Sequence, residues 1–135
     1  MYCFDTDVVS AVLRREPPLH LIRRLARTPA SEQSTTAITL GELLYGASRH
    51  GRDELTGRIR AVLLAAQTIL PFDEAAAEEY GPLRARLERA GRRLVEADLR
   101  IVSIVLARDL TLVTGNVRHF GRVGGLRVEN WLEPD

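Results

Sequence analysis

The sequence predicts an α/β fold in which helices cover both faces of a short parallel sheet. Two observations support this prediction. Short apolar or threonine-rich segments alternate with segments of helical periodicity along all 135 residues. The first apolar segment, residues 1–4, also runs directly into a helical pattern, as in βαβ units with right-handed crossovers. The length suits one domain, residues 1–135, that buries roughly two-thirds of its unfolded surface.

The N-terminal half contains two helices between its first two expected strands. Residues 1–4 form the first strand, and Asp7 is expected to cap a helix that reaches about residue 15. Pro17-Pro18 opens a second helix, because proline is favoured at a helix start. Its inward face is expected to carry the apolar side chains Leu19, Ile22, Leu25 and Ala26. Residues 33–37 are the second strand.

Two further helices follow the second strand. Thr39 is expected to cap the first of them, with Glu42 in its first turn. Gly51 interrupts the pattern, and residues 53–66 resume it with leucine, isoleucine and valine at helical spacing. Residues 68–70 are a third short strand, closed by Pro71.

The C-terminal half is organised around one very apolar helix. Asp73 caps a long helix that reaches residue 90, and Gly81-Pro82 is expected to kink or break it. Residues 97–107 have almost no polar face, which is typical of a central, buried helix, and Asp98 stands at its start. Residues 110–113 are a strand, residues 117–120 one helical turn, and residues 126–128 an edge strand.

The composition excludes several classes of protein. All 19 basic side chains are arginine, so there is no lysine for a P-loop, a Schiff base or a phosphate clamp. The single cysteine, Cys3, lies in the first apolar segment and is expected to be buried, so no intramolecular disulfide forms. A chain with one cysteine suits a reducing cytoplasm, so a cytoplasmic location is expected. No apolar run approaches the ~20 residues of a membrane span.

Three acidic residues are expected at one edge of the sheet. Asp5 follows the first strand, Glu42 lies soon after the second, and Asp98 begins the buried helix. Open parallel sheets bind ligands at the carboxyl ends of their strands. Carboxylates held close together repel one another unless a cation lies between them, and Mg²⁺ prefers oxygen ligands.

Four motifs resemble those of PIN-domain nucleases. They are Phe4-Asp5-Thr6-Asp7-Val8-Val9, Thr39-Leu40-Gly41-Glu42-Leu43-Leu44-Tyr45-Gly46-Ala47, Ala97-Asp98-Leu99-Arg100-Ile101 and Leu112-Val113-Thr114-Gly115-Asn116. Their order, approximate spacing and the chain length are most similar to the VapC-type toxins of toxin–antitoxin pairs. The resemblance implies an α/β/α sandwich, and we expect the strand order 3-2-1-4-5. It also implies an endoribonuclease in which Asp5, Glu42 and Asp98 hold Mg²⁺, or Mn²⁺ as a substitute.

The resemblance further implies a structured RNA substrate, either tRNA or ribosomal RNA, and a VapB-like antitoxin that blocks the acidic groove. A homodimer is also expected. The fourth motif departs from many relatives, since His119 stands where they carry another acid; Glu96 is a candidate substitute carboxylate. Thr6, Thr114 and Asn116 are candidates for orienting the ligands. Arg92-Arg93, which precede Asp98, are candidates for contacting RNA phosphate.

Two other functions are compatible with parts of the sequence. Asp5-Thr6-Asp7-Val8 after a strand also resembles the nucleophile motif of haloacid-dehalogenase-type phosphatases, although these generally need a lysine that this chain lacks. A non-catalytic PIN-like module that binds RNA or a protein is the other alternative. The presence of all three acids argues against it.

Overall fold

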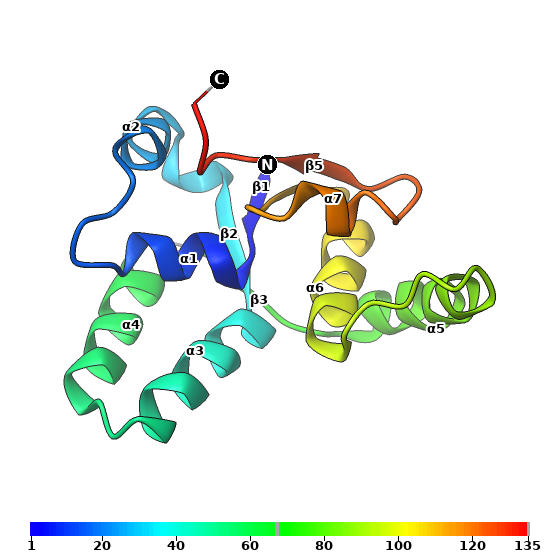
Figure 1. The fold of residues 1–135 in the computed structure, drawn as a ribbon, viewed down its shortest axis with the longest axis horizontal. Helices are drawn as coiled ribbons and strands as arrows, with labels where there is room; N and C mark the ends of the chain where they lie inside the picture. Colours follow the sequence, from blue (N-terminus) through cyan, green and yellow to red (C-terminus); the bar gives the residue numbers. More distant parts are fainter. Residues whose placement is uncertain (67, 135) are drawn as a thin grey trace.

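A five-stranded parallel sheet forms the centre of the protein (Figure 1). The computed structural model describes residues 1–66 and 68–134. Its strand order, β3-β2-β1-β4-β5, confirms the predicted order, and each neighbouring pair is parallel. The strands are β1 (Tyr2–Phe4), β2 (Gln33–Thr36), β3 (Thr68–Leu70), β4 (Thr111–Val113) and β5 (Arg127–Glu129).

The helices lie on the two sides of this sheet, so the predicted three-layer arrangement is confirmed (Figure 1). On one side are α1 (Thr6–Val12), α2 (Leu19–Arg27), α3 (Ala37–Arg49) and α4 (Asp53–Ala66). On the other side are α5 (Glu74–Arg89), α6 (Glu96–Ala107) and α7 (Val117–Phe120). A short 3-10 turn, η1 (Ala30–Glu32), leads into β2.

Each side of the sheet has its own hydrophobic core. Successive residues of a strand face opposite sides, so Cys3 and Leu112 join the core beneath α5 and α6. Phe4 and Val113 join the other core, together with Trp131 from the C-terminal tail. The α6 helix is buried as predicted, because Ile101, Val102, Ile104 and Val105 are all fully covered. Within the described residues, no helix is long and apolar enough to cross a lipid bilayer.

Asp73 caps α5 as predicted, by accepting the Ala76 N–H, but the other two predicted helix caps are wrong by two or three residues. Asp5, not Asp7, caps α1, because the Asp5 side chain accepts the Val8 N–H while Asp7 lies in the first turn. Thr36, not Thr39, caps α3 by accepting the Thr39 N–H. In each case the cap is the last residue of the preceding strand or the residue directly after it. Glu42 consequently lies in the second turn of α3 rather than in its first turn.

Two further expectations about the helices are corrected by the structure. The α5 helix runs unbroken from Glu74 to Arg89 through Gly81-Pro82, held by Leu83 and Leu87, which are buried in the core. The α2 helix turns only part of the predicted face inward: Leu25 packs against the core as expected, but the fully buried residue is Leu21. Leu19 and Ile22 are exposed instead, with 61% and 38% of their surface accessible.

Candidate metal and nuclease site

Asp5 lies at the centre of the candidate site, where β1 ends and α1 begins. Its backbone N–H donates to the Val113 carbonyl at 3.0 Å, which extends the β1–β4 ladder by one residue. Its Oδ1 then accepts the Val8 N–H at 3.0 Å and caps α1. Only 4% of Asp5 is exposed, so a carboxylate is held in a nearly dry position at the carboxyl edge of the sheet.

The environment of Asp5 disfavours its charged form. Burial raises the pKa of Asp5 from 3.8 to about 6, although hydrogen bonds from Thr114 and the Val8 N–H oppose this rise. The negative charges of Asp7 and Asp98 contribute to the rise in this pKa. Asp5, Asp7 and Asp98 therefore lie close enough to repel one another, which is the condition that a bound cation relieves.

Asp98 reaches this edge from the first turn of α6. Its Oδ2 lies 3.1 Å from Nε2 of His119, which the short α7 helix presents. Partial burial raises the pKa of Asp98, the hydrogen bond and charge of His119 lower it, and Asp7 raises it. His119, at the position of the fourth motif, thus contacts a candidate ligand rather than replacing one.

Glu42 reaches the site from α3 and is more exposed than Asp5. Thr6, the residue after Asp5, donates its hydroxyl to Glu42 Oε1 at 2.7 Å. The Thr6 hydroxyl also lies 3.3 Å from the hydroxyl of Thr39, which is fully buried. Thr6 therefore links Glu42 to the neighbouring Asp5, as expected of a residue that orients a metal ligand.

The other predicted site residues divide into two groups. Thr114 bonds to Asp5 and accepts the Asn116 N–H at 3.0 Å, so it belongs to the site. Glu96 is directed to a different surface, where Tyr80 donates to it and Arg100 contacts it at 3.0 Å. This pairing, which lowers the pKa of Glu96, argues against its use as a substitute ligand. Asn116 lies before α7 with no cap made by its side chain.

Arg92 and Arg93 are exposed in the connector between α5 and α6, with the Arg93 carbonyl accepting from Arg122 at 3.4 Å.

Asp7 is an additional acid near the site, although the sequence indicated only the role of a helix cap for it. It is exposed, and its charge acts on both Asp5 and Asp98. The sequence signal for this electrostatic role of Asp7 was the repeated acid in Asp5-Thr6-Asp7. Because Asp5 makes the helix cap, the Asp7 carboxylate is not used as a cap and adds negative charge to the site.

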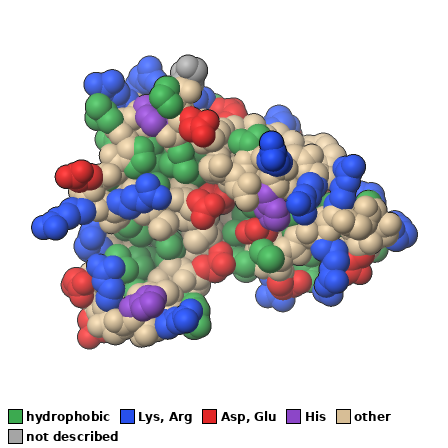
Figure 2. Space-filling model, in the orientation of Figure 1, with side chains coloured by type: hydrophobic (Ala, Val, Ile, Leu, Met, Phe, Trp, Pro, Cys, Tyr) green, Lys and Arg blue, Asp and Glu red, His purple; other side chains and the backbone are tan. Residues whose placement is uncertain are grey.

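The donor set fits a hard divalent cation that keeps several water ligands. Within the described part of the chain, no three acidic, histidine or cysteine side chains are arranged to hold a metal ion by themselves. Mg²⁺ does not need such a cage, because it commonly uses one or two carboxylates plus water and phosphate oxygens. The buried Asp5 carboxylate and the partly buried Asp98 carboxylate, which repel each other, match that requirement. Figure 2 shows acidic side chains gathered in a hollow between the α1–α3 side and the α6–α7 side.

Comparison with known proteins agrees with this geometry. Residues 2–126 match the PIN domain family. Ribonuclease VapC2 of Haemophilus influenzae is 33% identical over 131 residues, which cover 97% of this chain and 98% of that protein. The tRNA(fMet)-specific endonuclease VapC of Shigella flexneri is 32% identical, covering 96% of this chain and 97% of its own.

A solved structure gives the same result. The DNA-bound VapBC of Salmonella typhimurium superimposes with a TM-score of 0.83 at 31% identity, covering 96% of this chain and 97% of that chain. The chain belongs to the PIN-domain family, and within it to the VapC ribonucleases.

Proposed function

We propose that this chain is a metal-dependent endoribonuclease toxin that hydrolyses phosphodiester bonds in RNA. The observation that supports this proposal most directly is the buried Asp5 carboxylate, with its raised pKa, beside Asp7 and Asp98. An acidic edge of this kind is costly to maintain unless it binds a cation. Mg²⁺ is the proposed ion, with Mn²⁺ as a substitute, because both accept carboxylate and water oxygens.

In the proposed site, Asp5 and Asp98 would hold the ion directly, and Glu42 would act through water. A bound Mg²⁺ lowers the pKa of a water molecule and offsets charge on the leaving oxygen. His119 would hold the Asp98 carboxylate in orientation through its 3.1 Å contact. Thr6 and Thr114 would do the same for Glu42 and Asp5 through their hydroxyl groups.

The relatives suggest the substrate and the partner. The Shigella flexneri relative is a tRNA(fMet)-specific endonuclease, so tRNA is the first substrate to test. The Salmonella typhimurium structure is a VapBC complex, which supports neutralisation of this chain by a VapB-like antitoxin. A homodimer is the further assembly that we propose, and light scattering of the purified chain tests it.

One experiment tests the nuclease assignment. The purified chain is incubated with total RNA and Mg²⁺, the new RNA ends are mapped, and the reaction is repeated with EDTA. We expect discrete cleavage that EDTA abolishes and that Asp5→Asn and Asp98→Asn each reduce at least 100-fold. Equal cleavage by both variants and the original chain would contradict the assignment.

The same preparation separates the two alternatives. RNA binding without cleavage in either metal would favour a non-catalytic binding module. Release of phosphate from p-nitrophenyl phosphate would favour the phosphatase, in which Asp5 would be a covalent nucleophile.

A further inference from the structure

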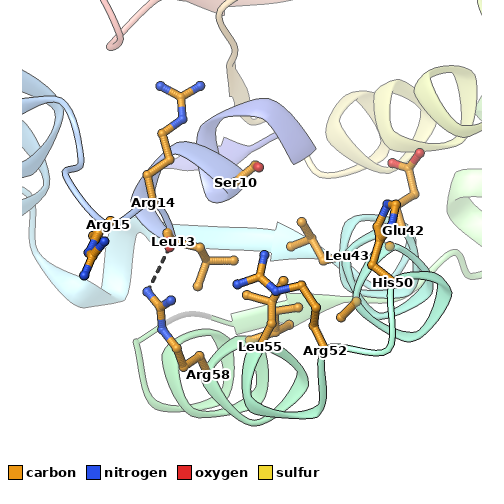
Figure 3. A pocket seen from close by; sticks show the side chains of 13 residues that line it. Ser10, Leu13, Arg14, Arg15, Glu42, Leu43, His50, Arg52, Leu55 and Arg58 are labelled. Carbon is orange, nitrogen blue, oxygen red and sulfur yellow. Dashed lines mark hydrogen bonds between the residues drawn. The ribbon is translucent and has the colours of Figure 1, made fainter.

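A large cavity lies beside the acidic edge, between α1, α3 and α4 (Figure 3). Its volume is about 870 Å³, which is within the range of ligand-binding clefts. Apolar side chains, including Leu43, Leu55 and Ile59, form part of its lining. Four arginines also line it: Arg14, Arg15, Arg52 and Arg58. Among the described residues around the cavity, Glu42 is the only acid.

The charges of these arginines are poorly compensated. Arg58 donates to the Leu13 carbonyl at 2.8 Å, a contact that leaves its positive charge unpaired. Arg52 approaches Glu54 at 3.4 Å, but both side chains are more than half exposed, so this pair is weak. Among the residues that the structure describes, no acid forms an ion pair with Arg14, Arg15 or Arg58. The cavity is therefore an electropositive cleft suited to an anionic ligand.

The position of Glu42 connects this cleft to the candidate active site. Glu42 lines the cavity and also accepts the hydroxyl of Thr6, which directly follows Asp5. In Figure 3, Arg15 and Arg58 lie toward one end of the cavity, Arg52 extends into its middle, and Glu42 lies at the opposite end. A chain bound along the cavity would therefore run from the arginines to the acids.

The lining suits a nucleic acid strand, which alternates charged phosphates with less polar sugars and bases. The planar guanidinium group presents paired N–H donors that match two phosphate oxygens. The apolar lining offers contact to the sugar and base faces. An acidic protein segment would also satisfy the arginines, but it would bring carboxylates, rather than a reactive phosphodiester, to Glu42 and the acidic edge.

We propose that the cavity between α1, α3 and α4 is a groove for the RNA strand, in which Arg14, Arg15, Arg52 and Arg58 bind phosphates flanking the bond to be cleaved. This inference rests on the proposed nuclease function and adds the surface that positions the substrate. Arg58 also supports the fold through the Leu13 carbonyl, so the test leaves it unchanged.

The test measures RNA binding separately from cleavage. The affinity of the full chain for labelled bulk tRNA is measured in EDTA by fluorescence anisotropy over a range of salt concentrations. The test variant carries Arg14→Ala, Arg15→Ala and Arg52→Ala. The logarithm of the binding constant falls linearly with the logarithm of the salt concentration. For a single strand, removing one phosphate-binding arginine reduces the magnitude of this slope by roughly 0.7. We therefore expect a slope about 2 smaller and binding about 100-fold weaker at 0.1 M salt.

Two further variants control for net charge and for folding. Arg23→Ala, Arg86→Ala and Arg89→Ala remove the same charge from exposed positions outside the cavity and should weaken binding less than about threefold. Arg14→Lys, Arg15→Lys and Arg52→Lys keep the charge and should stay within about tenfold of the original affinity. Far-ultraviolet circular dichroism checks that all three variants are folded.

The proposal is overturned if the alanine variant binds tRNA like the original chain, or if the control variant loses as much affinity. Unchanged tRNA binding with lost binding of the antitoxin would instead assign the cavity to a protein partner. Arginine-dependent binding without any cleavage would contradict the nuclease function but leave the groove in place. Unchanged binding and unchanged cleavage in the alanine variant would contradict the groove alone.

Discussion

Asp5 combines a structural role with a proposed chemical role. Its Oδ1 satisfies a free N–H group at the start of α1, and the rest of its carboxylate faces Thr114 and the acidic edge. A cap normally stabilises a helix by about 1 kcal/mol, but this one lies at a position where only 4% of the residue is exposed. Burial of the Asp5 charge destabilises the folded state and so opposes the stabilisation from the cap. Such buried charges are common in active sites.

Asp5→Asn is therefore expected to stabilise the metal-free protein at pH 8 while removing its nuclease activity. The pKa of Asp5 is about 6 when folded against 3.8 in the unfolded chain, so the folded state binds the proton more tightly. The contribution of Asp5 to stability is greatest below about pH 3.8 and is lost as the pH rises through about 6. Two pKa units correspond to about 3 kcal/mol, an upper limit for the gain from asparagine, which keeps the cap.

Urea unfolding in EDTA at pH 4.5 and pH 8 measures this effect. The difference in free energy of unfolding between Asp5→Asn and the original chain should be large at pH 8 and smaller at pH 4.5. Asp7→Asn is the matched control on the same helix, and because Asp7 is exposed, it should change stability by less than about 1 kcal/mol. A less stable Asp5→Asn at pH 8 would show that its carboxylate is not under electrostatic strain.

His119 is expected to act through Asp98. Because its Nε2 lies 3.1 Å from Asp98 Oδ2, His119→Ala should leave that carboxylate free to rotate. Loss of such an orienting partner typically lowers metal affinity or activity by about 10- to 100-fold. Calorimetric titration with Mn²⁺ measures the affinity directly, and Asp98→Asn should reduce it further. His119→Gln, which keeps an amide donor, should recover part of the loss; equal Mn²⁺ affinity in His119→Ala would remove His119 from the site.

At the scale of single elements, α5 shows tertiary packing prevailing over local preference. Pro82 lacks the N–H that an interior helical residue donates, and its ring crowds the carbonyl of Glu78. The helix nevertheless continues, because Leu83 and Leu87 bury their side chains against α6. The unfavourable local conformation is thus offset by the burial of the leucines that follow the proline.

Pro82→Ala should consequently stabilise the protein by about 1–3 kcal/mol, since alanine restores the donor and removes the steric conflict. Gly81→Ala is a milder companion change. Apart from its chain neighbours and the backbone of its own helix, no atom lies within 4 Å of a Cβ at that position, and the expected gain is about 1 kcal/mol. Thermal unfolding of Pro82→Ala, Gly81→Ala and the original chain measures these changes in stability. A decrease in stability for Pro82→Ala would show that the proline fits a bend that the helix needs.

Which features the sequence predicts depends on whether they are local or tertiary. Hydrophobic periodicity located α6 and the strands, because the burial of Ile104 or Leu112 follows from spacing alone. The caps of α1 and α3 were misplaced, unlike the cap of α5 at Asp73, because Asp5 and Asp7, like Thr36 and Thr39, are equally good capping residues in sequence. Only the hydrogen bonds to Val8 and Thr39 distinguish them.

The candidate site shows the same limit. The motifs indicated Asp5, Glu42 and Asp98, but the pairing of His119 with Asp98 joins residues 21 positions apart. No local pattern could predict it. Glu96, by contrast, lies on another surface of α6, where it contacts Arg100 of the same helix and Arg84 of α5, and helix geometry alone could have separated it from Asp98. Two residues along a helix are about 200° apart, so Glu96 and Asp98 point in nearly opposite directions.

At the scale of the whole molecule, the acidic edge lies where the two cores meet. Asp5 and Glu42 come from the α1–α4 side of the sheet, whereas Asp98 and His119 come from the α6–α7 side (Figure 1). Repulsion between Asp5 and Asp98 therefore acts between the two halves of the fold. A cation at this edge would join them, so metal binding and global stability should be coupled.

Mg²⁺ is accordingly expected to raise the unfolding temperature at pH 8, independently of any RNA. A ligand present at 100 times its dissociation constant stabilises the folded state by about 2.7 kcal/mol. The increase should be smaller at pH 5, because below its folded pKa of about 6 Asp5 is largely protonated and its proton competes with the ion. Differential scanning calorimetry with Mg²⁺ or EDTA at both pH values measures the effect. The double variant Asp5→Asn, Asp98→Asn should show no Mg²⁺ dependence at either pH, whereas an undiminished Mg²⁺ effect in that variant would place the ion elsewhere on the protein.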